Sequence, residues 1–195
     1  MRHIGVIAFV QIQRVPLKVM QEGRRVYQPA ALERMAALRL SERGVRGIDT
    51  SGASILDAHH VDHPQSRHRG GANGVSLGFL PHYDAMRARF GPHLSDGIAG
   101  ENILIESELA LRTEDFAEQL IIRPAHGSTD VYLRDVFAAE PCSEFSAFCA
   151  GRVIGGAELV QVLDFLSEGR RGFYATLAAP LPDVEIQPGD TLWIP

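Results

Sequence analysis

The sequence has little cysteine and no long apolar run. Its two cysteines, Cys142 and Cys149, are too few for an iron–sulfur cluster or an all-cysteine zinc site. No apolar stretch approaches the roughly 20 residues that cross a bilayer, and the first residues lack the apolar region and cleavage site of a signal peptide. We therefore expect a cytoplasmic protein without membrane contact, whose thiols stay reduced and form no structural disulfide.

Lysine is also scarce, and positive charge does not predominate. The net charge of -5 argues against a nucleic-acid-binding surface, which normally needs a basic stripe. Lys18 is the only lysine, so 18 of the 19 basic residues are arginine. A biased genome can produce this pattern, but forked arginine donors also suit phosphate and carboxylate groups. An anionic ligand is therefore compatible with the composition.

What is present indicates a soluble globular chain of 195 residues with enough length for one domain, residues 1–195. Short apolar or alternating runs separated by turn residues predict strands, and amphipathic or proline-opened segments predict helices. The expected strands are 3–12, 48–56, 75–80, 102–106, 118–123, 130–138, 173–177, 184–186 and 191–194, and the expected helices are 30–41, 82–90 and 157–167. This order predicts an α+β, mostly β fold: a closed or half-closed barrel with short helices packed outside it.

The densest polar segment of the chain is residues 57–69, which contains four of the eight histidines. His59 and His63 would share one face of a helix, and Asp57 or Asp62 could complete a mixed nitrogen–oxygen metal site. Pro64 and the glycines that follow disfavour a helix, and no HExxH frame is present. Both a metal site and a solvated loop near an anionic ligand stay open for this segment.

Cys142 lies directly after Pro141, which ends the preceding strand by removing a backbone donor. A thiol at the end of a strand can be presented for chemistry, but free cysteine is also a common core residue. Cys149 shares one face of a short helix with Phe145 and Phe148, and we assign it to the core. Asn102, at the exit of a glycine-flanked turn, suits either a turn cap or ligand recognition.

The order of four segments resembles the MOSC domain, the module at the C-terminus of molybdenum-cofactor sulfurases and in related small bacterial proteins. The segments are Gly100-Glu101-Asn102-Ile103, Glu140-Pro141-Cys142-Ser143-Glu144-Phe145, Arg171-Gly172-Phe173-Tyr174-Ala175 and Pro188-Gly189-Asp190. The resemblance covers about residues 45–195 and is most specific over 97–148. Relatives often carry a Gly-Asp-Arg-His-type segment early in the domain, and the equivalent region here is 57–69.

The resemblance implies a MOSC-like β-barrel that binds the molybdenum cofactor (molybdopterin) or handles sulfur for it. Cys142 would be the key residue, as a molybdenum ligand or as a persulfide carrier, and thiolate is the soft nucleophile that both roles need. Arginines would hold the phosphate of the pterin. The cofactor-binding candidates are Asn102, Arg67, Arg69, Arg171 and Ser143, with Asn102 either contacting the ligand or pinning the loop around it.

Three hypotheses about function follow. The first is a cofactor-binding MOSC protein that reduces N-oxygenated small molecules, with electrons from a partner protein because the chain has no ferredoxin-like cysteine set. The second is a sulfur carrier or binding module without turnover, which would need a sulfur-donor protein. The third, which gives Cys142 no role, is a metal-dependent hydrolase that uses His59, His63 and Asp62.

Overall fold

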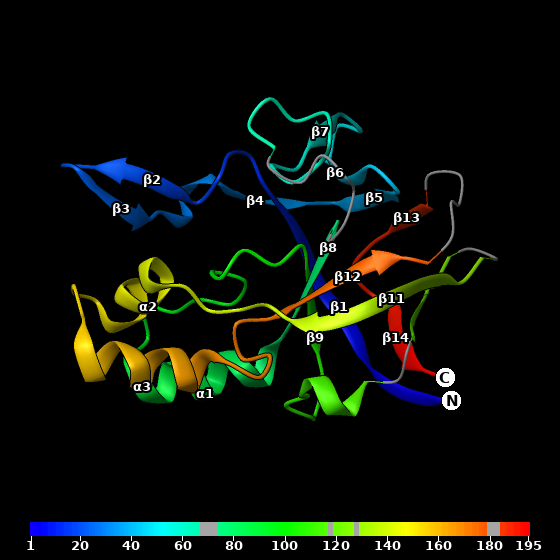
Figure 1. Cartoon of the computed structure of the whole chain (residues 1–195). Coiled ribbons are helices and arrows are strands. Elements are labelled where there is room, and N and C mark those ends of the chain that lie inside the picture. The colour runs from blue at the N-terminus through cyan, green and yellow to red at the C-terminus, as the bar shows by residue number, and fades with distance from the viewer. Residues whose placement is uncertain (67–73, 117–118, 127–128, 179–183) are drawn as a thin grey trace.

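A computed structural model of the chain describes residues 1–66, 74–116, 119–126, 129–178 and 184–195 (Figure 1). Its strands are β1 (Arg2–Gln13), β2 (Lys18–Gln21), β3 (Arg24–Tyr27), β4 (Leu32–Met35), β5 (Ala37–Ser41), β6 (Gly44–Ile48), β7 (Ser54–Leu56), β8 (Val75–Phe79), β9 (Ile103–Glu106), β10 (Gln119–Arg123), β11 (Val131–Ala138), β12 (Phe173–Leu177), β13 (Val184–Ile186) and β14 (Thr191–Ile194). Its helices are α1 (Leu80–Phe90), α2 (Ser143–Ala150) and α3 (Gly156–Leu166), with single 3-10 turns at Pro29–Ala31 and Thr113–Asp115.

Within these residues, seven strands close into a barrel in the order β14-β10-β11-β12-β8-β9-β1, because β1 also pairs with β14. Neighbouring barrel strands are antiparallel, apart from the parallel pair β8–β9. Closure leaves no exposed edge in the ring, which is how small β-proteins avoid edge-to-edge aggregation. The predicted mostly β class with a barrel and short peripheral helices is confirmed.

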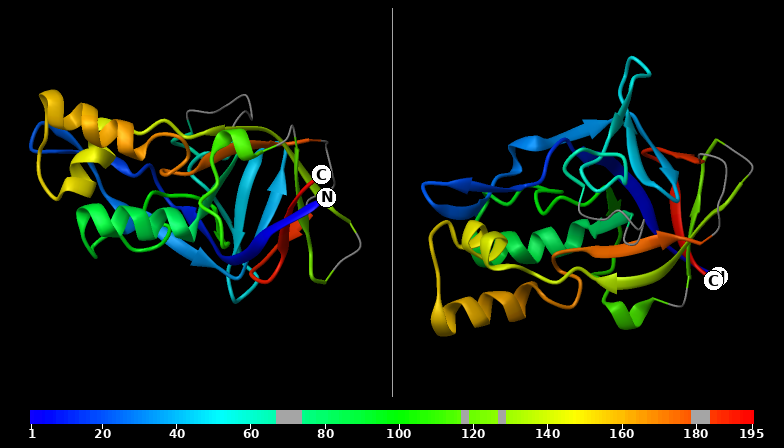
Figure 2. Two further views of the ribbon diagram at one scale, coloured as in Figure 1. Left: turned by 90° about the horizontal axis from the view of Figure 1, so that it is seen from below. Right: turned by 45° about the horizontal axis from the view of Figure 1, so that its top comes forward.

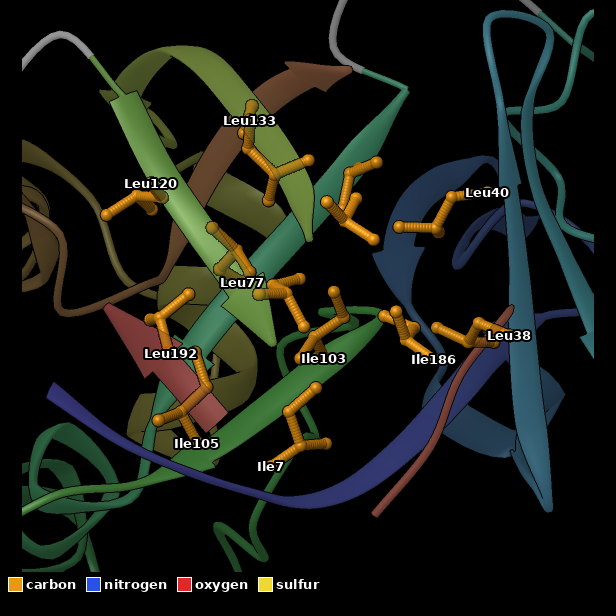
Figure 3. Close-up of a cluster of buried hydrophobic side chains, with 14 of the residues drawn as sticks. Ile7, Leu38, Leu40, Leu77, Ile103, Ile105, Leu120, Leu133, Ile186 and Leu192 are labelled. Atoms are coloured by element: carbon orange, nitrogen blue, oxygen red, sulfur yellow. The ribbon is translucent and has the colours of Figure 1, made fainter. Parts of the chain in front are cut away.

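A second sheet, β13-β5-β6-β7, packs against the barrel and shares its core. Its apolar side chains meet side chains that the barrel strands contribute (Figure 3). The residues that Figure 3 labels are Ile7, Leu38, Leu40, Leu77, Ile103, Ile105, Leu120, Leu133, Ile186 and Leu192. Burial of this apolar surface is the main favourable term in folding.

A second apolar cluster holds the helices at one end of the molecule, away from the paired chain termini (Figures 1 and 2). The β2–β3 hairpin lies beside α2, and Tyr27 packs its ring edge-on against Phe145, with 4.9 Å between ring centroids. Cys149, on the inner face of α2, belongs to this cluster and is fully buried, so its assignment to the core is confirmed. Burial raises the pKa of the Cys149 thiol to about 12.

The predicted helix over 30–41 is wrong, because this stretch forms β4 and β5 after a 3-10 turn that starts at Pro29. Its apolar residues fit a helical face equally well, but β4 pairs with β1 and β5 pairs with β6. Tertiary pairing therefore overrides local helix propensity here. The predicted strand 48–56 is also divided, into the end of β6 and the short β7.

The strand that leads to Cys142 carries a bulge. The register between β11 and β12 shifts between Arg134 and Phe137, and Asp135 adopts a φ of 52°. A bulge bends a strand and increases its twist, and here it interrupts the alternation of buried and exposed residues along β11. β11 ends at Ala138, and the four residues 139–142 separate it from α2.

No helix in the described part of the chain is both long and apolar enough to cross a membrane.

Candidate functional site

A cleft lies where three parts of the chain that are distant in sequence come together. The β2–β3 hairpin forms one wall, the turns at residues 58–65 a second, and the loop before β12 a third. The cleft has a volume of about 190 Å³ and opens to solvent. Its lining residues are Gln13, Pro16, Leu17, Lys18, Arg25, Tyr27, Ala58, His59, Gln65, Ala99, Arg171 and Tyr174.

Arg171 is the cation at the inner end of this cleft. Its backbone N–H donates to the carbonyl of Leu166 at 3.1 Å, which anchors it at the end of α3. Among the residues that the structure describes, no carboxylate oxygen lies within 4.0 Å of its guanidinium, and its buried Nε has no hydrogen-bond partner. A buried polar group without a partner destabilises a fold by about 1–3 kcal/mol, so this donor is suited to an external acceptor.

Ionisable groups surround the Arg171 guanidinium. Burial lowers the pKa of Arg171, but nearby Tyr174, Tyr27, Glu101 and Cys142 raise it, and the net shift is upward. Burial in turn raises the pKa of Tyr27 well above its ordinary value, and its hydroxyl donates to the carbonyl of Ile98 at 2.7 Å. The inner end of the cleft therefore carries a fixed positive charge.

Cys142 lies beside the cleft, at the N-cap of α2, rather than among its described lining residues. Its side chain is half-buried, in contrast to Cys149. The thiol hydrogen-bonds to the Glu144 carboxylate, which also lies 3.9 Å from Lys18 Nζ and 3.6 Å from Arg25 Nε. Burial raises the pKa of Glu144, but its own backbone N–H, the Cys142 thiol and the two cations lower it below its ordinary value.

Glu101 forms the wall of a small inner cavity behind the cleft. This cavity has a volume of about 10 Å³, close to that needed for one water molecule, and it shares Gln13, Ala99, Arg171 and Tyr174 with the cleft. Burial raises the pKa of Glu101 from 4.5 to about 7, although the Tyr83 hydroxyl and Arg171 lower it. The sequence motif predicted a role for Asn102 and none for Glu101. Only the burial of Glu101 identifies this residue as part of the site.

Asn102 is 3 % exposed, and its carboxamide is engaged within the protein. Oδ1 accepts from the Ser76 hydroxyl at 2.9 Å, and Nδ2 donates to Asp57 Oδ2 at 3.0 Å and to the Gln11 carbonyl at 3.2 Å. Two roles were expected for Asn102, ligand contact and pinning of the loop, and these contacts within the protein fit the second. Ser143, the first residue of α2, is exposed, and its hydroxyl lies 3.4 Å from Glu144 Oε2.

Asp57 and His59 form a dyad at the second wall of the cleft. The Asp57 carboxylate is 1 % exposed and accepts from the backbone N–H and the Nδ1 of His59, at 2.8 and 2.9 Å. It also accepts from the Gln13 N–H at 2.8 Å. Burial raises the pKa of Asp57, but these donors outweigh it and the pKa lies below its ordinary value.

The histidine segment does not assemble the metal site that its spacing allows. Residues 58–65 form turns rather than a helix, His63 Nε2 lies 3.1 Å from the Arg14 carbonyl, and Asp62 pairs with Arg43. Throughout the described ranges, no group of three or more histidine, cysteine, aspartate or glutamate side chains is placed to hold a metal ion. Arg67 and Arg69, two of the predicted cofactor-binding residues, lie outside the described residues.

Comparisons with known proteins identify the fold. No family model matches the chain, and no curated protein matches it in sequence. Among solved structures it is similar to YuaD from Bacillus subtilis, at 10% identity over 96% of this chain and 93% of that one, with a TM-score of 0.58. It is also similar to YiiM from Geobacillus stearothermophilus, at 16% identity over 96% of this chain and 73% of that one, with a TM-score of 0.54.

A third solved structure, of a hypothetical protein, matches at 13% identity over 97% of this chain and 68% of that one, with a TM-score of 0.54. The likeness to YuaD and YiiM extends over nearly the whole of this chain. At these identities the likeness extends to the fold alone.

Proposed function

We propose that this chain is a MOSC protein that binds the molybdenum cofactor, with Cys142 as the sulfur ligand of the metal and Arg171 as the anchor of the pterin phosphate. The observation that carries the proposal is Arg171 itself. It is a cation at the inner end of a cleft, with a buried donor that lacks a partner among the described residues. A guanidinium is a suitable donor for phosphate oxygens, which it can bind in a forked manner.

The residues around the cleft fit this group in three respects. The cleft has a volume of about 190 Å³, which leaves room for an anionic group such as a phosphate beside Arg171. Lys18 and Arg25 line the outer part, where Glu144 partly neutralises both, so Arg171 is the cation best placed to receive an anion. The half-buried thiol of Cys142 lies beside the same cleft, and thiolate is a soft ligand that suits such metals.

Each residue would have a distinct task. The bound cofactor would supply a redox-active metal centre at the cleft. Cys142, at the N-cap of α2, would supply the sulfur ligand, and Glu144 beside it pairs with Lys18 and Arg25 at the outer part of the cleft. The half-buried Tyr174 offers a ring surface that can pack against a planar pterin.

The experiment is expression in a host that makes the cofactor, followed by elemental analysis for molybdenum and fluorescence detection of the oxidised pterin. Cys142→Ala is expected to lose the metal, and Arg171→Gln to lose both metal and pterin. Cys149→Ala is the matched control, because it removes the other thiol of the same helix from the core. Retention of molybdenum at the wild-type level in Cys142→Ala would refute the ligand role.

A second candidate function is sulfur transfer, in which Cys142 carries a persulfide without further turnover. The observation that favours it is the difference between the two cysteines, because Cys142 is half-buried while Cys149 is fully buried. Incubation with a cysteine desulfurase and cysteine should then add one sulfur atom to Cys142, visible by intact mass and peptide mapping. Absence of this adduct, with the desulfurase shown to be active on a known acceptor, would count against the carrier role.

A further inference from the structure

Glu101 is a buried carboxyl group that the proposed function does not use. It lies directly before Asn102, with 3 % of its surface exposed. The Tyr83 hydroxyl contacts both of its oxygens, at 2.9 Å to Oε1 and 2.7 Å to Oε2. A hydroxyl has one proton to donate, and an ionised carboxylate can accept about four hydrogen bonds. The described donors therefore leave the ionised form of Glu101 weakly compensated.

The surrounding backbone is shaped to leave room for this carboxyl group. A Cβ atom at Gly78 would lie 2.7 Å from Glu101 Oε1, and one at Gly172 would lie 2.8 Å from Glu101 Cγ. Gly172 also has a φ of 106°, which residues with a side chain rarely adopt. The polypeptide therefore holds Glu101 in one position against the inner cavity, next to Arg171.

The charges that face Glu101 come from four parts of the chain. Arg171, before β12, favours its ionised form, and Asp96, in the loop after α1, disfavours it. Tyr83, from α1, hydrogen-bonds it, and Tyr27, from β3, is close enough for its own pKa to be raised by Glu101. Arg171 is the only cation among these described groups, so the charge state of Glu101 depends on how far that cation is neutralised.

We propose that binding of an anion to Arg171 is coupled to uptake of a proton by Glu101. An anion paired with the guanidinium cancels the charge that favours the Glu101 carboxylate, and the carboxyl then takes a proton from solvent. The inner cavity, with room for about one water molecule between Glu101 and the cleft, provides the route for this proton. This inference rests on the proposed function in one respect, namely that Arg171 receives an anion.

The direction of the coupling follows from linkage. Glu101 has a pKa of about 7 in the free protein, so near neutral pH both of its forms are populated. A bound anion raises that pKa, so Glu101 has one pKa in the free protein and a higher one in the anion-bound protein. Between these two pKa values, the affinity for the anion falls as pH rises, by up to about tenfold per pH unit. Binding is therefore expected to take up a fraction of a proton, and most of it at a pH between these two pKa values.

Sulfate is the probe, because its charge is constant over the pH range and its own titration cannot mimic that of Glu101. Isothermal titration calorimetry in buffers of different ionisation enthalpy gives both the affinity and the number of protons taken up. We expect proton uptake in the wild type and none in Glu101→Gln, whose affinity should be independent of pH and at least equal to that of the wild type at about pH 8. Glu33→Gln, a surface change on β4, is the matched control and should behave as the wild type.

Several results would overturn the inference. These are no sulfate binding, binding without proton uptake, and wild-type uptake that persists in Glu101→Gln. Uptake that is lost only in His59→Gln would assign the proton to the imidazole on the cleft wall instead.

If Glu101→Gln does not fold, Tyr83→Phe replaces it. This change removes a hydrogen bond that lowers the pKa of Glu101, so the midpoint of the pH dependence should move upward, and an unchanged midpoint would contradict the coupling. The sulfate measurement uses apoprotein. It can therefore succeed where no molybdenum is acquired, and fail where molybdenum is acquired, so the two proposals are tested separately.

Discussion

Replacing Glu101 by glutamine should change how the stability of this protein depends on pH. Folding raises the pKa of Glu101 from 4.5 to about 7, so the folded state holds its proton more tightly than the unfolded state. The associated stability is fully present below about pH 4.5 and is lost as pH rises through about 7. Glutamine has nearly the same shape, keeps an acceptor for the Tyr83 hydroxyl and carries no charge.

The magnitude follows from the two pKa values. Each pKa unit corresponds to about 1.4 kcal/mol, so ionisation of Glu101 lowers the free energy of unfolding by about 2–3 kcal/mol between about pH 5 and pH 8.5. Glu101→Gln should therefore be as stable as the wild type to within about 1 kcal/mol near pH 5 and more stable by about 2–3 kcal/mol near pH 8.5. Other titrating groups, such as His60 and His82, are common to both proteins and cancel in the difference.

The assay is urea denaturation at a series of pH values, followed by the fluorescence of Trp193, the only tryptophan in the sequence. The difference in free energy of unfolding between the two proteins is then plotted against pH. A difference that is constant across the range would refute the reasoning, because it would mean that Glu101 titrates at the same pH in the folded and unfolded states.

Three further predictions concern the two cysteines, a glycine beside Glu101 and the buried carboxylate of Asp57. A thiol-alkylating reagent should label Cys142 in the native protein and Cys149 only after unfolding, as peptide mass mapping would show. Equal labelling rates for the two thiols would contradict the difference in their burial. Gly172→Ala should lower the free energy of unfolding by about 2 kcal/mol or more, because the added Cβ meets Glu101 and Leu77. Gly52 also has a positive φ, of 86°, but open space around it, so Gly52→Ala should lower the free energy of unfolding by only about 1 kcal/mol in the same urea assay. Asp57→Ala should cost about 3 kcal/mol because it leaves several buried donors unpaired, and a loss under about 1 kcal/mol would show that water replaces the carboxylate.

Much of the fold could be read from local patterns. Short apolar runs between turn residues located β1, β8 and β9, and alternation located β11. A proline start located α1, and an amphipathic pattern located α3. The stretch 30–41 could not be assigned in this way, since its apolar spacing fits a helix as well as two short strands. The pairing of β4 with β1 and of β5 with β13 decided the matter, and these partner strands are distant in the chain.

The site was accessible from the sequence in part. The motif segments led to Cys142 and Arg171, which the structure brings to the same end of the molecule, within electrostatic range of one another. Asn102 belongs to a correctly identified turn, but its carboxamide is engaged by Ser76, Gln11 and Asp57, residues far from it in the chain. Its local sequence could not distinguish that structural role from ligand recognition.

By itself, the sequence determined a mostly β chain with short helices, two unlinked cysteines and a cysteine motif that ends a strand. Only the tertiary structure decided how far Cys142 is exposed, and that Arg171 has a buried Nε donor without a partner among the described residues. It also decided that Glu101 is enclosed between two glycines. The reason is that burial and charge compensation depend on segments that the barrel brings together, and local sequence does not encode such distances.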